Sequence, residues 1–227
     1  KALLSPKKPL VAIVGGSKVS TKITLLKNLV KKVDHLIIGG GMANTFLHSK
    51  NKQIGRSLCE KNLSKLCKEI LLSAKKFNCN IHLPVDIICA YELKKNQEIT
   101  THNINLCPPD KMILDCGPNT VSKICNILKK SNTLIWNGPL GAFETVPFNF
   151  STEEVANLAA KLTKTGQLKS IAGGGDTVSA LKSANVLNDF SYVSYAGGAF
   201  LEWMEGKELP GIKALEKKKD ENKKFNF

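Results

Sequence analysis

Short apolar runs alternate with longer amphipathic stretches along this chain. The runs predict strands that are buried on both faces. The stretches between them repeat apolar residues near the helical period, as Val19, Ile23, Leu26 and Val30 do. Strands are expected at residues 10–14, 36–38, 80–83, 87–90, 112–114, 133–136, 169–172 and 192–193, and helices include residues 63–77, 121–128 and 155–162. This alternation predicts a Rossmann-like three-layer α/β/α domain with a central parallel sheet.

The rest of the chain divides around this pattern. Residues 10–215 are expected to form the domain, and residues 94–109 a polar surface loop within it. Residues 216–227 form a lysine-rich tail, and residues 1–9 precede the first strand. Because the sequence does not begin with Met, we expect an excerpt of a longer chain or a processed fragment.

Glycine clusters follow three of the predicted strands. They lie at Gly15-Gly16, Gly39-Gly40-Gly41 and Gly173-Gly174-Gly175. Strand ends of a parallel sheet share one edge, where open α/β folds bind ligands. Glycine lets a phosphate approach backbone N–H groups at a helix N-terminus, so a phosphorylated ligand is expected here. Tight packing between strand and helix is the alternative explanation of the same glycines.

The phosphate site is not of the P-loop type, because no GxxxxGK[ST] motif is present. Gly39 to Ala43 loosely fits a dinucleotide fingerprint, but the acidic residue expected about 20 residues later, at the end of a second strand, is absent. A nicotinamide or flavin enzyme is therefore the weaker hypothesis. Lys18 and Lys22 are four residues apart at an expected helix start, so they share one face. They either neutralise phosphate oxygens or are two solvated lysines.

Composition excludes several other classes. The net charge is +14, but Arg56 is the only arginine, whereas base readers and phosphate clamps favour the arginine fork. Nucleic acid is therefore not an expected partner. No apolar run approaches the roughly 20 residues of a membrane span, and no secretory signal precedes the first strand. The seven dispersed Cys residues are typical of reduced, buried thiols in a cytosolic protein.

Seven sequence blocks, in order, carry a resemblance to a known family. They are Gly15-Gly16-Ser17-Lys18-Val19-Ser20, Gly39-Gly40-Gly41-Met42-Ala43-Asn44-Thr45-Phe46-Leu47, Leu83-Pro84-Val85-Asp86, Asp115-Cys116-Gly117-Pro118, Trp136-Asn137-Gly138-Pro139-Leu140-Gly141-Ala142-Phe143-Glu144, Gly173-Gly174-Gly175-Asp176-Thr177 and Leu209-Pro210-Gly211. Together, from about Pro9 to Leu215, they resemble phosphoglycerate kinase. The resemblance implies the C-terminal domain of that family, which binds Mg-ADP or Mg-ATP.

The resemblance also implies residue roles. Lys18 and Lys22 would contact the nucleotide phosphates, with Lys22 nearest the transferring group, and Asp176 would hold the Mg²⁺. The adenine pocket would include Gly15, Gly39, Gly40 and Leu114, the ribose would lie against Pro139 and Glu144, and the phosphates would meet Asn137, Gly174, Gly175 and Thr177. Gly197 and Gly198, at the start of a last helix, would offer N–H groups to the transferring phosphoryl group. Asp176 as a plain helix N-cap is the alternative.

The implied chemistry needs no general base. The substrate carboxylate and ADP carry no proton that must be removed, so phosphoryl transfer requires alignment and charge neutralisation. In the family, a second, N-terminal lobe holds 3-phosphoglycerate with an arginine-rich patch, which this chain cannot present. Residues 1–9 would then be a remnant of the interlobe helix or linker. A glycolytic, cytoplasmic and monomeric enzyme half is implied, and a stand-alone nucleotide-binding module without catalysis is the alternative.

Three departures from the family pattern bear on this expectation. Thr21 stands where the family usually has an acidic residue, and Ser151 replaces a usual glycine. Tyr195 and Ala196 replace Thr and Gly in the block before Gly197. The Tyr195 ring either narrows the site or turns outward, so it affects phosphoryl transfer more than nucleotide binding.

Overall fold

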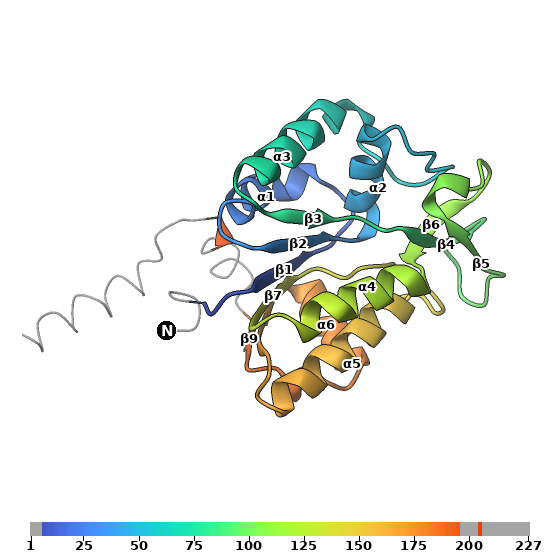
Figure 1. The fold of residues 1–227 in the computed structure, drawn as a ribbon. Helices are drawn as coiled ribbons and strands as arrows, with labels where there is room; N and C mark the ends of the chain where they lie inside the picture. The colour runs from blue at the N-terminus through green and yellow to red at the C-terminus, as the bar shows by residue number, and fades with distance from the viewer. Residues whose placement is uncertain (1–5, 196–203, 206–227) are drawn as a thin grey trace, which may run out of the picture.

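A six-stranded parallel sheet forms the centre of the molecule (Figure 1). The computed structural model describes residues 6–195 and 204–205. The strand order is β3-β2-β1-β7-β8-β9, and every neighbouring pair is parallel. The strands are β1 Leu10–Val14, β2 His35–Ile38, β3 Asn80–His82, β7 Thr133–Asn137, β8 Lys169–Gly173 and β9 Tyr192–Ser194. The predicted fold class is confirmed.

Helices cover both faces of this sheet, as Figure 1 shows. One face carries α1 Ile23–Leu29, α2 Gly40–Ser49 and α3 Ser64–Lys76, and the other carries α4 Pro118–Lys129, α5 Phe150–Lys164 and α6 Gly175–Ser183. Short 3₁₀ helices span Ser20–Lys22, Lys61–Leu63, Ile104–Leu106 and Leu187–Asp189. In the part of the chain that is described, no helix combines the length and the apolar character that crossing a bilayer requires.

The core explains why β1 is apolar throughout. Ala12 and Val14 point into the layer of α1 to α3, whereas Val11 and Ile13 point into the layer of α4 to α6. Full burial of such a side chain contributes about 1.5–3 kcal/mol, so both layers depend on β1. Five of the seven cysteines are buried and all seven are free thiols, as predicted.

A second sheet was not predicted. The strands β4 Asp86–Ala90, β5 Thr100–Asn103 and β6 Met112–Cys116 form an antiparallel sheet in the order β5-β4-β6 at one end of the molecule (Figure 1). The loop predicted for residues 94–109 was therefore wrong in part, because it contains β5 and a 3₁₀ helix. All four side chains of β5 are polar, and the strand forms by pairing with β4 rather than by burying a face.

Other boundaries differ less. Lys18 precedes the 3₁₀ helix Ser20–Lys22, so the two lysines do not share one α-helical face as predicted. Residues 6–9 are irregular. The predicted last glycine-started helix, the tail at 216–227 and residues 1–5 lie outside the described residues. The sheet order places a topological switch point between β1 and β7, where neighbouring strands lead to helices on opposite faces.

Candidate functional site

The carboxyl ends of β1 and β7 meet around one lysine. Gly15 N donates to Asn137 O at 2.9 Å, which extends the pairing of the two strands. Lys22 Nζ donates to Gly15 O at 2.7 Å and to Asn137 Oδ1 at 2.6 Å. The ammonium group is thus held at the switch point by oxygens that carry no full charge. Lys18 lies nearby in the sequence but is exposed.

Lys22 has an unusual electrostatic setting. Burial lowers its pKa from 10.5 to about 8, and this effect is partly opposed by the charge of Asp176. Among the ion pairs of residues 6–195, none includes Lys22 or Asp176. A partly buried cation without a contacting carboxylate is stabilised when an anion binds, so this position favours a negatively charged ligand.

The β8–α6 turn supplies the next part of the site. Gly174, with φ +97°, is the N-cap of α6, and Asp176 lies exposed in the first turn without a capping hydrogen bond. The plain N-cap explanation of Asp176 is therefore wrong. Thr177 and Asn137 are buried, and both donate to Gly173 O, at 2.9 and 2.8 Å. Thr177 Oγ1 also accepts from Gly138 N at 2.7 Å, so these side chains tie the strand ends together.

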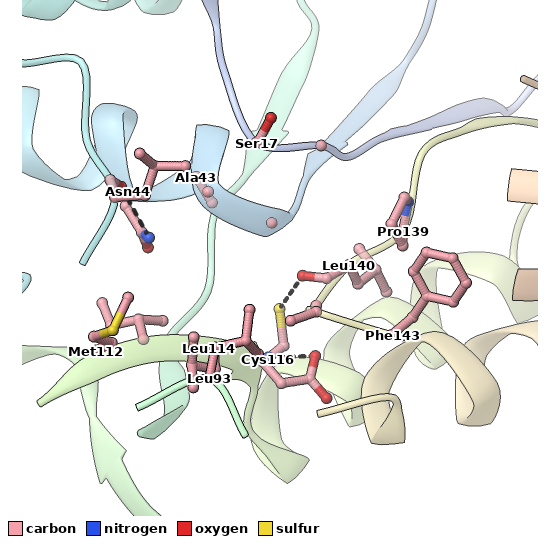
Figure 2. Close-up of a pocket in the computed structure, with 18 of the residues that line it drawn as sticks. Ser17, Ala43, Asn44, Leu93, Met112, Leu114, Cys116, Pro139, Leu140 and Phe143 are labelled. Carbon is pink, nitrogen blue, oxygen red and sulfur yellow. Dashed lines mark hydrogen bonds between the residues drawn. The ribbon is translucent and has the colours of Figure 1, made fainter. Parts of the chain in front are cut away.

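A cavity of about 400 Å³ opens beside this cluster (Figure 2). Its walls come from the start of α2, from β6 and from the segment after β7. Of the predicted site residues, Gly40, Leu114, Pro139, Glu144 and Asp176 line it. The following predicted residues do not line it: Gly15, Lys18, Lys22, Gly39, Asn137, Gly174, Gly175 and Thr177. Gly197 and Gly198 lie outside the described residues.

The cavity walls are largely apolar, and the sequence patterns did not identify several of them. Leu58 and Leu93 line the cavity although they are 46% and 49% exposed. Met112, Leu114 and Phe143 add further apolar surface (Figure 2). Leu58 and Leu93 are isolated apolar residues in loops, where periodicity gives no signal. A cavity of this size and character suits a flat, mainly apolar ligand group.

The structure separates the two explanations of the glycine clusters. A Cβ atom on Gly15 would lie 1.7 Å from Pro139 O, and one on Gly39 would lie 2.6 Å from Leu140 Cδ2. Gly40 has φ +65°, and a Cβ atom on it would lie 2.6 Å from Gly16 O. Packing therefore accounts for these glycines. Around Gly175, by contrast, no atom lies within 4 Å of an added Cβ, so packing gives no reason for a glycine there.

Mg²⁺ is the metal that the family resemblance implies at this site. Within the described residues, no group of three or more His, Cys, Asp or Glu side chains is placed to hold a metal ion. Mg²⁺ bound together with a nucleotide typically uses one or two carboxylates and the phosphates themselves. The exposed Asp176 beside Lys22 fits that arrangement.

Thr21 and Tyr195, two of the departures from the family pattern, are exposed. Thr21 Oγ1 donates to Lys18 O at 2.8 Å, so it stabilises the lysine-bearing turn locally. Tyr195 is 71% exposed and does not line the cavity. Its ring is therefore turned outward in the part of the site that is described.

These features define an α/β protein with a ligand-sized cavity at the carboxyl edge of its parallel sheet. Residues 1–207 match the family Phosphoglycerate kinase. A phosphoglycerate kinase of Methylorubrum extorquens (strain PA1) is 59% identical over 215 residues, which are 95% of this chain and 54% of that protein. The chain therefore belongs to the phosphoglycerate kinase family.

Solved structures agree with this placement. The structure of phosphoglycerate kinase from Coxiella burnetii matches with a TM-score of 0.89 and 47% identity, over 96% of this chain and 55% of that one. The enzyme from Pyrococcus horikoshii OT3 matches with a TM-score of 0.77 and 26% identity, over 95% and 54%. The chain thus spans about half the length of the relatives that it matches.

Proposed function

We propose that this chain is the nucleotide-binding half of a phosphoglycerate kinase. It would bind ADP or ATP with Mg²⁺ and, together with a lobe that holds 3-phosphoglycerate or 1,3-bisphosphoglycerate, transfer the phosphoryl group between them. The observation that carries this proposal is the partly buried Lys22 at the β1–β7 switch point, whose ammonium group lies against Gly16, a residue that lines the apolar cavity of about 400 Å³.

The cavity would take the nucleoside. The adenine base would lie against Leu114 and Gly40, which line the cavity. Gly15 and Gly39 would support this wall from behind, where their backbones pack against Pro139 and Leu140. The ribose would lie against Pro139, and the exposed Glu144 carboxylate would accept hydrogen bonds from its hydroxyl groups. The apolar walls would supply most of the binding free energy for the base.

The phosphates would lie toward the switch point. Lys22 and Lys18 would neutralise phosphate oxygens, with Asn137 and Thr177 beside them. The N–H groups of Gly174 and Gly175 would face the phosphates at the positive end of α6, and Gly197 and Gly198 would face the transferring group. Asp176 would hold the Mg²⁺, which neutralises phosphate charge when it is bound.

In this reaction the residues would align the substrates and neutralise their charge, and no proton transfer is needed. Neither nucleophile carries a proton to remove, and within residues 6–195 no His lines the cavity. A glycolytic role, a cytoplasmic location and a monomeric state are parts of the same proposal, and nucleic acid is not a proposed partner.

Calorimetric titration of the chain with Mg-ADP tests the proposal. We expect a micromolar to millimolar Kd, about −4 to −8 kcal/mol. Lys22→Met should weaken binding strongly, because it removes the partly buried positive charge. Lys164→Met is the matched control, because it removes an exposed lysine that pairs with Asp189 and does not line the cavity. It should bind Mg-ADP like the parent chain. Absence of saturable heat at millimolar nucleotide would contradict the proposal.

A further inference from the structure

Asp115 is a buried carboxylate that the proposed reaction does not use. It lies near the carboxyl end of β6, is 3% exposed and lines the cavity. An uncompensated buried carboxylate is strongly unfavourable, so its partners show what holds it there.

The partners of Asp115 belong mainly to another element. Its Oδ2 accepts from Ser151 N at 2.9 Å, and its Oδ1 accepts from the Ser151 hydroxyl group and from Cys116 N at 2.8 Å. Ser151 is in the first turn of α5, whose own N-cap residue, Asn149, makes no side-chain capping bond. The carboxylate therefore caps α5 from the neighbouring sheet.

The same carboxylate contacts the wall of the cavity. A Cβ atom on Gly141 would lie 2.0 Å from Asp115 Oδ1, so the backbone of this wall segment packs directly on the carboxylate. Two further bonds hold the segment on either side. Ala142 N donates to Leu114 O at 2.9 Å, and Leu140 N donates to Thr152 Oγ1 at 3.0 Å.

We propose that Asp115 is a positioning residue for the adenosine end of the nucleotide. By joining β6 to the first turn of α5 and supporting Gly141, it fixes the segment 139–145, which carries Pro139 and Glu144. This inference rests on the proposed function for the identity of the ligand, but the clamp itself can be measured without a ligand.

The charge of Asp115 gives the clamp a pH dependence. Burial raises the pKa of Asp115 to about 7, partly opposed by the hydrogen bonds from Ser151 and from Cys116 N. The other titratable groups close by are Cys116 on β6 and Asp86 on β4, and Glu144 lines the same cavity. Above pH 7 both carboxylate oxygens accept, whereas protonation converts one acceptor into a donor. Because burial raises the pKa of Asp115, the clamp is most stable when this carboxyl is protonated and loses stability as the pH rises through about 7. The difference between Asp115→Asn and the parent chain should be largest at pH 8, where the parent residue is charged, and smaller at pH 6, where it is largely neutral like asparagine.

Asp86 provides a matched control. It is 4% exposed, lies on β4 and caps the other nearby helix, α4, by accepting from Asn119 N at 2.8 Å and Thr120 N at 2.7 Å. It also accepts from the Thr120 hydroxyl group at 2.6 Å. It does not line the cavity. A substitution there tests the general effect of losing a buried helix cap.

The experiment compares Asp115→Asn with Asp86→Asn in the full 227-residue chain. Binding of adenosine and of Mg-ADP is measured at pH 8 and pH 6, and amide hydrogen exchange is measured at Leu140 and Ala142. We expect Asp115→Asn to weaken both ligands by about tenfold at pH 8, roughly one hydrogen bond, and by less at pH 6. Asp86→Asn should stay within about twofold of the parent chain, because Asp86 does not line the cavity and caps α4 rather than α5.

Each outcome decides the proposal. Equal losses for the two variants, or a loss for Mg-ADP without one for adenosine, would overturn it. If the parent chain binds neither ligand, the proposed function fails, and amide hydrogen exchange alone tests the structural role of Asp115. Faster exchange at Leu140 and Ala142 in Asp115→Asn but not in Asp86→Asn supports that role. Unchanged exchange in Asp115→Asn overturns it. If Asp115→Asn does not fold, Ser151→Ala removes only the hydroxyl bond and should show the same pattern with a loss of about threefold.

Discussion

Lys22 is partly buried at a position where the described part of the chain gives it no contacting carboxylate. Carbonyl and amide oxygens accept hydrogen bonds from its ammonium group. The carboxylate of Asp176 stabilises the charge of Lys22 electrostatically, without a direct contact. Such a group destabilises the folded state relative to a solvated lysine, as residues at binding sites often do. We interpret this as preorganisation for the phosphate charge of the nucleotide.

The lowered pKa of Lys22 predicts that affinity for ADP depends on pH in the alkaline range. The charged form binds phosphate, and at a pKa of about 8 the ammonium group loses its proton between pH 7 and 9. Affinity for ADP should therefore fall by up to about tenfold over that range. Lys22→Arg keeps the charge, so its affinity should stay level from pH 7 to 9 in calorimetric titrations. Parallel declines in both proteins would show that another group titrates.

The proposed role of Asp176 in holding Mg²⁺ predicts a metal-dependent loss of affinity when this residue is replaced. A carboxylate that holds Mg²⁺ acts on the nucleotide through the ion, so Asp176→Ala should weaken Mg-ADP about tenfold or more and metal-free ADP much less. Titrations with Mg²⁺ and with EDTA measure the difference. Asp110→Asn, which changes an exposed carboxylate away from the cavity, should alter neither affinity. Equal losses of Asp176→Ala with and without Mg²⁺ would contradict the metal role.

At the scale of elements, the turns after β1 and β8 use glycine for different reasons. The β1 turn needs glycine because backbone from the β7 turn lies against Gly15, whereas the α6 start leaves open space at Gly175. Gly15→Ala should therefore destabilise the fold by about 3 kcal/mol or more. Gly175→Ala should stabilise it by up to about 1 kcal/mol through helix propensity, yet weaken ADP at least fivefold.

Urea unfolding and calorimetry together check this pair of variants. The informative result is opposite signs for stability and binding in Gly175→Ala. Unchanged ADP affinity in that variant would mean that no phosphate approaches the start of α6.

Hydrophobic pattern predicted the central sheet well because both helix layers bury its strands. β1 is apolar along its whole length for that reason, and β7 is buried along its whole length with an apolar centre. The same pattern could not show that β4 and β6 belong to a separate antiparallel sheet, since a buried strand looks alike in either. β5 was missed because its order comes from backbone pairing, which polar residues such as Thr100 and His102 also allow.

The site was predictable in the same uneven way. The glycine-rich strand ends indicated which edge of the sheet carries the site, and Lys22, Asn137 and Asp176 do lie together there. Their individual roles came only from the family resemblance and stay predictions. Leu58 and Leu93 come from loops whose positions depend on tertiary contacts, and no local pattern marks them. The support given by Asp115 through Ser151 could not be inferred, because the two residues are far apart in the sequence.

At the scale of the whole molecule, the candidate site is a surface rather than an enclosed chamber. The cavity lies between the two helix layers and the small sheet, and its apolar rim at Leu58 and Leu93 is exposed. The family resemblance implies a second lobe that closes over the substrates, and this chain spans about half the length of its relatives. Nucleotide binding and phosphoryl transfer should therefore be separable properties of this polypeptide.

Nucleotide binding by this chain should not be accompanied by phosphoryl transfer. The 227-residue chain alone should show no measurable transfer between ATP and 3-phosphoglycerate, and addition of the N-terminal half of a related enzyme should restore part of it. Transfer needs both substrates in line and near contact, an alignment worth about 7–11 kcal/mol. Arg56, the only arginine, is exposed and outside the cavity, so the described residues offer no guanidinium clamp for a second anionic substrate.

A coupled assay with and without the added half makes the measurement. Asp176→Ala, assayed with the added half, is the control and should abolish the restored activity, which shows that turnover depends on this chain. Robust turnover by the chain alone would contradict the separation. If the added half restores nothing although Mg-ADP binds, the stand-alone binding module is favoured. Tyr195→Thr then becomes the decisive variant, because it changes the residue next to the block that would face the transferring group while leaving the cavity walls intact.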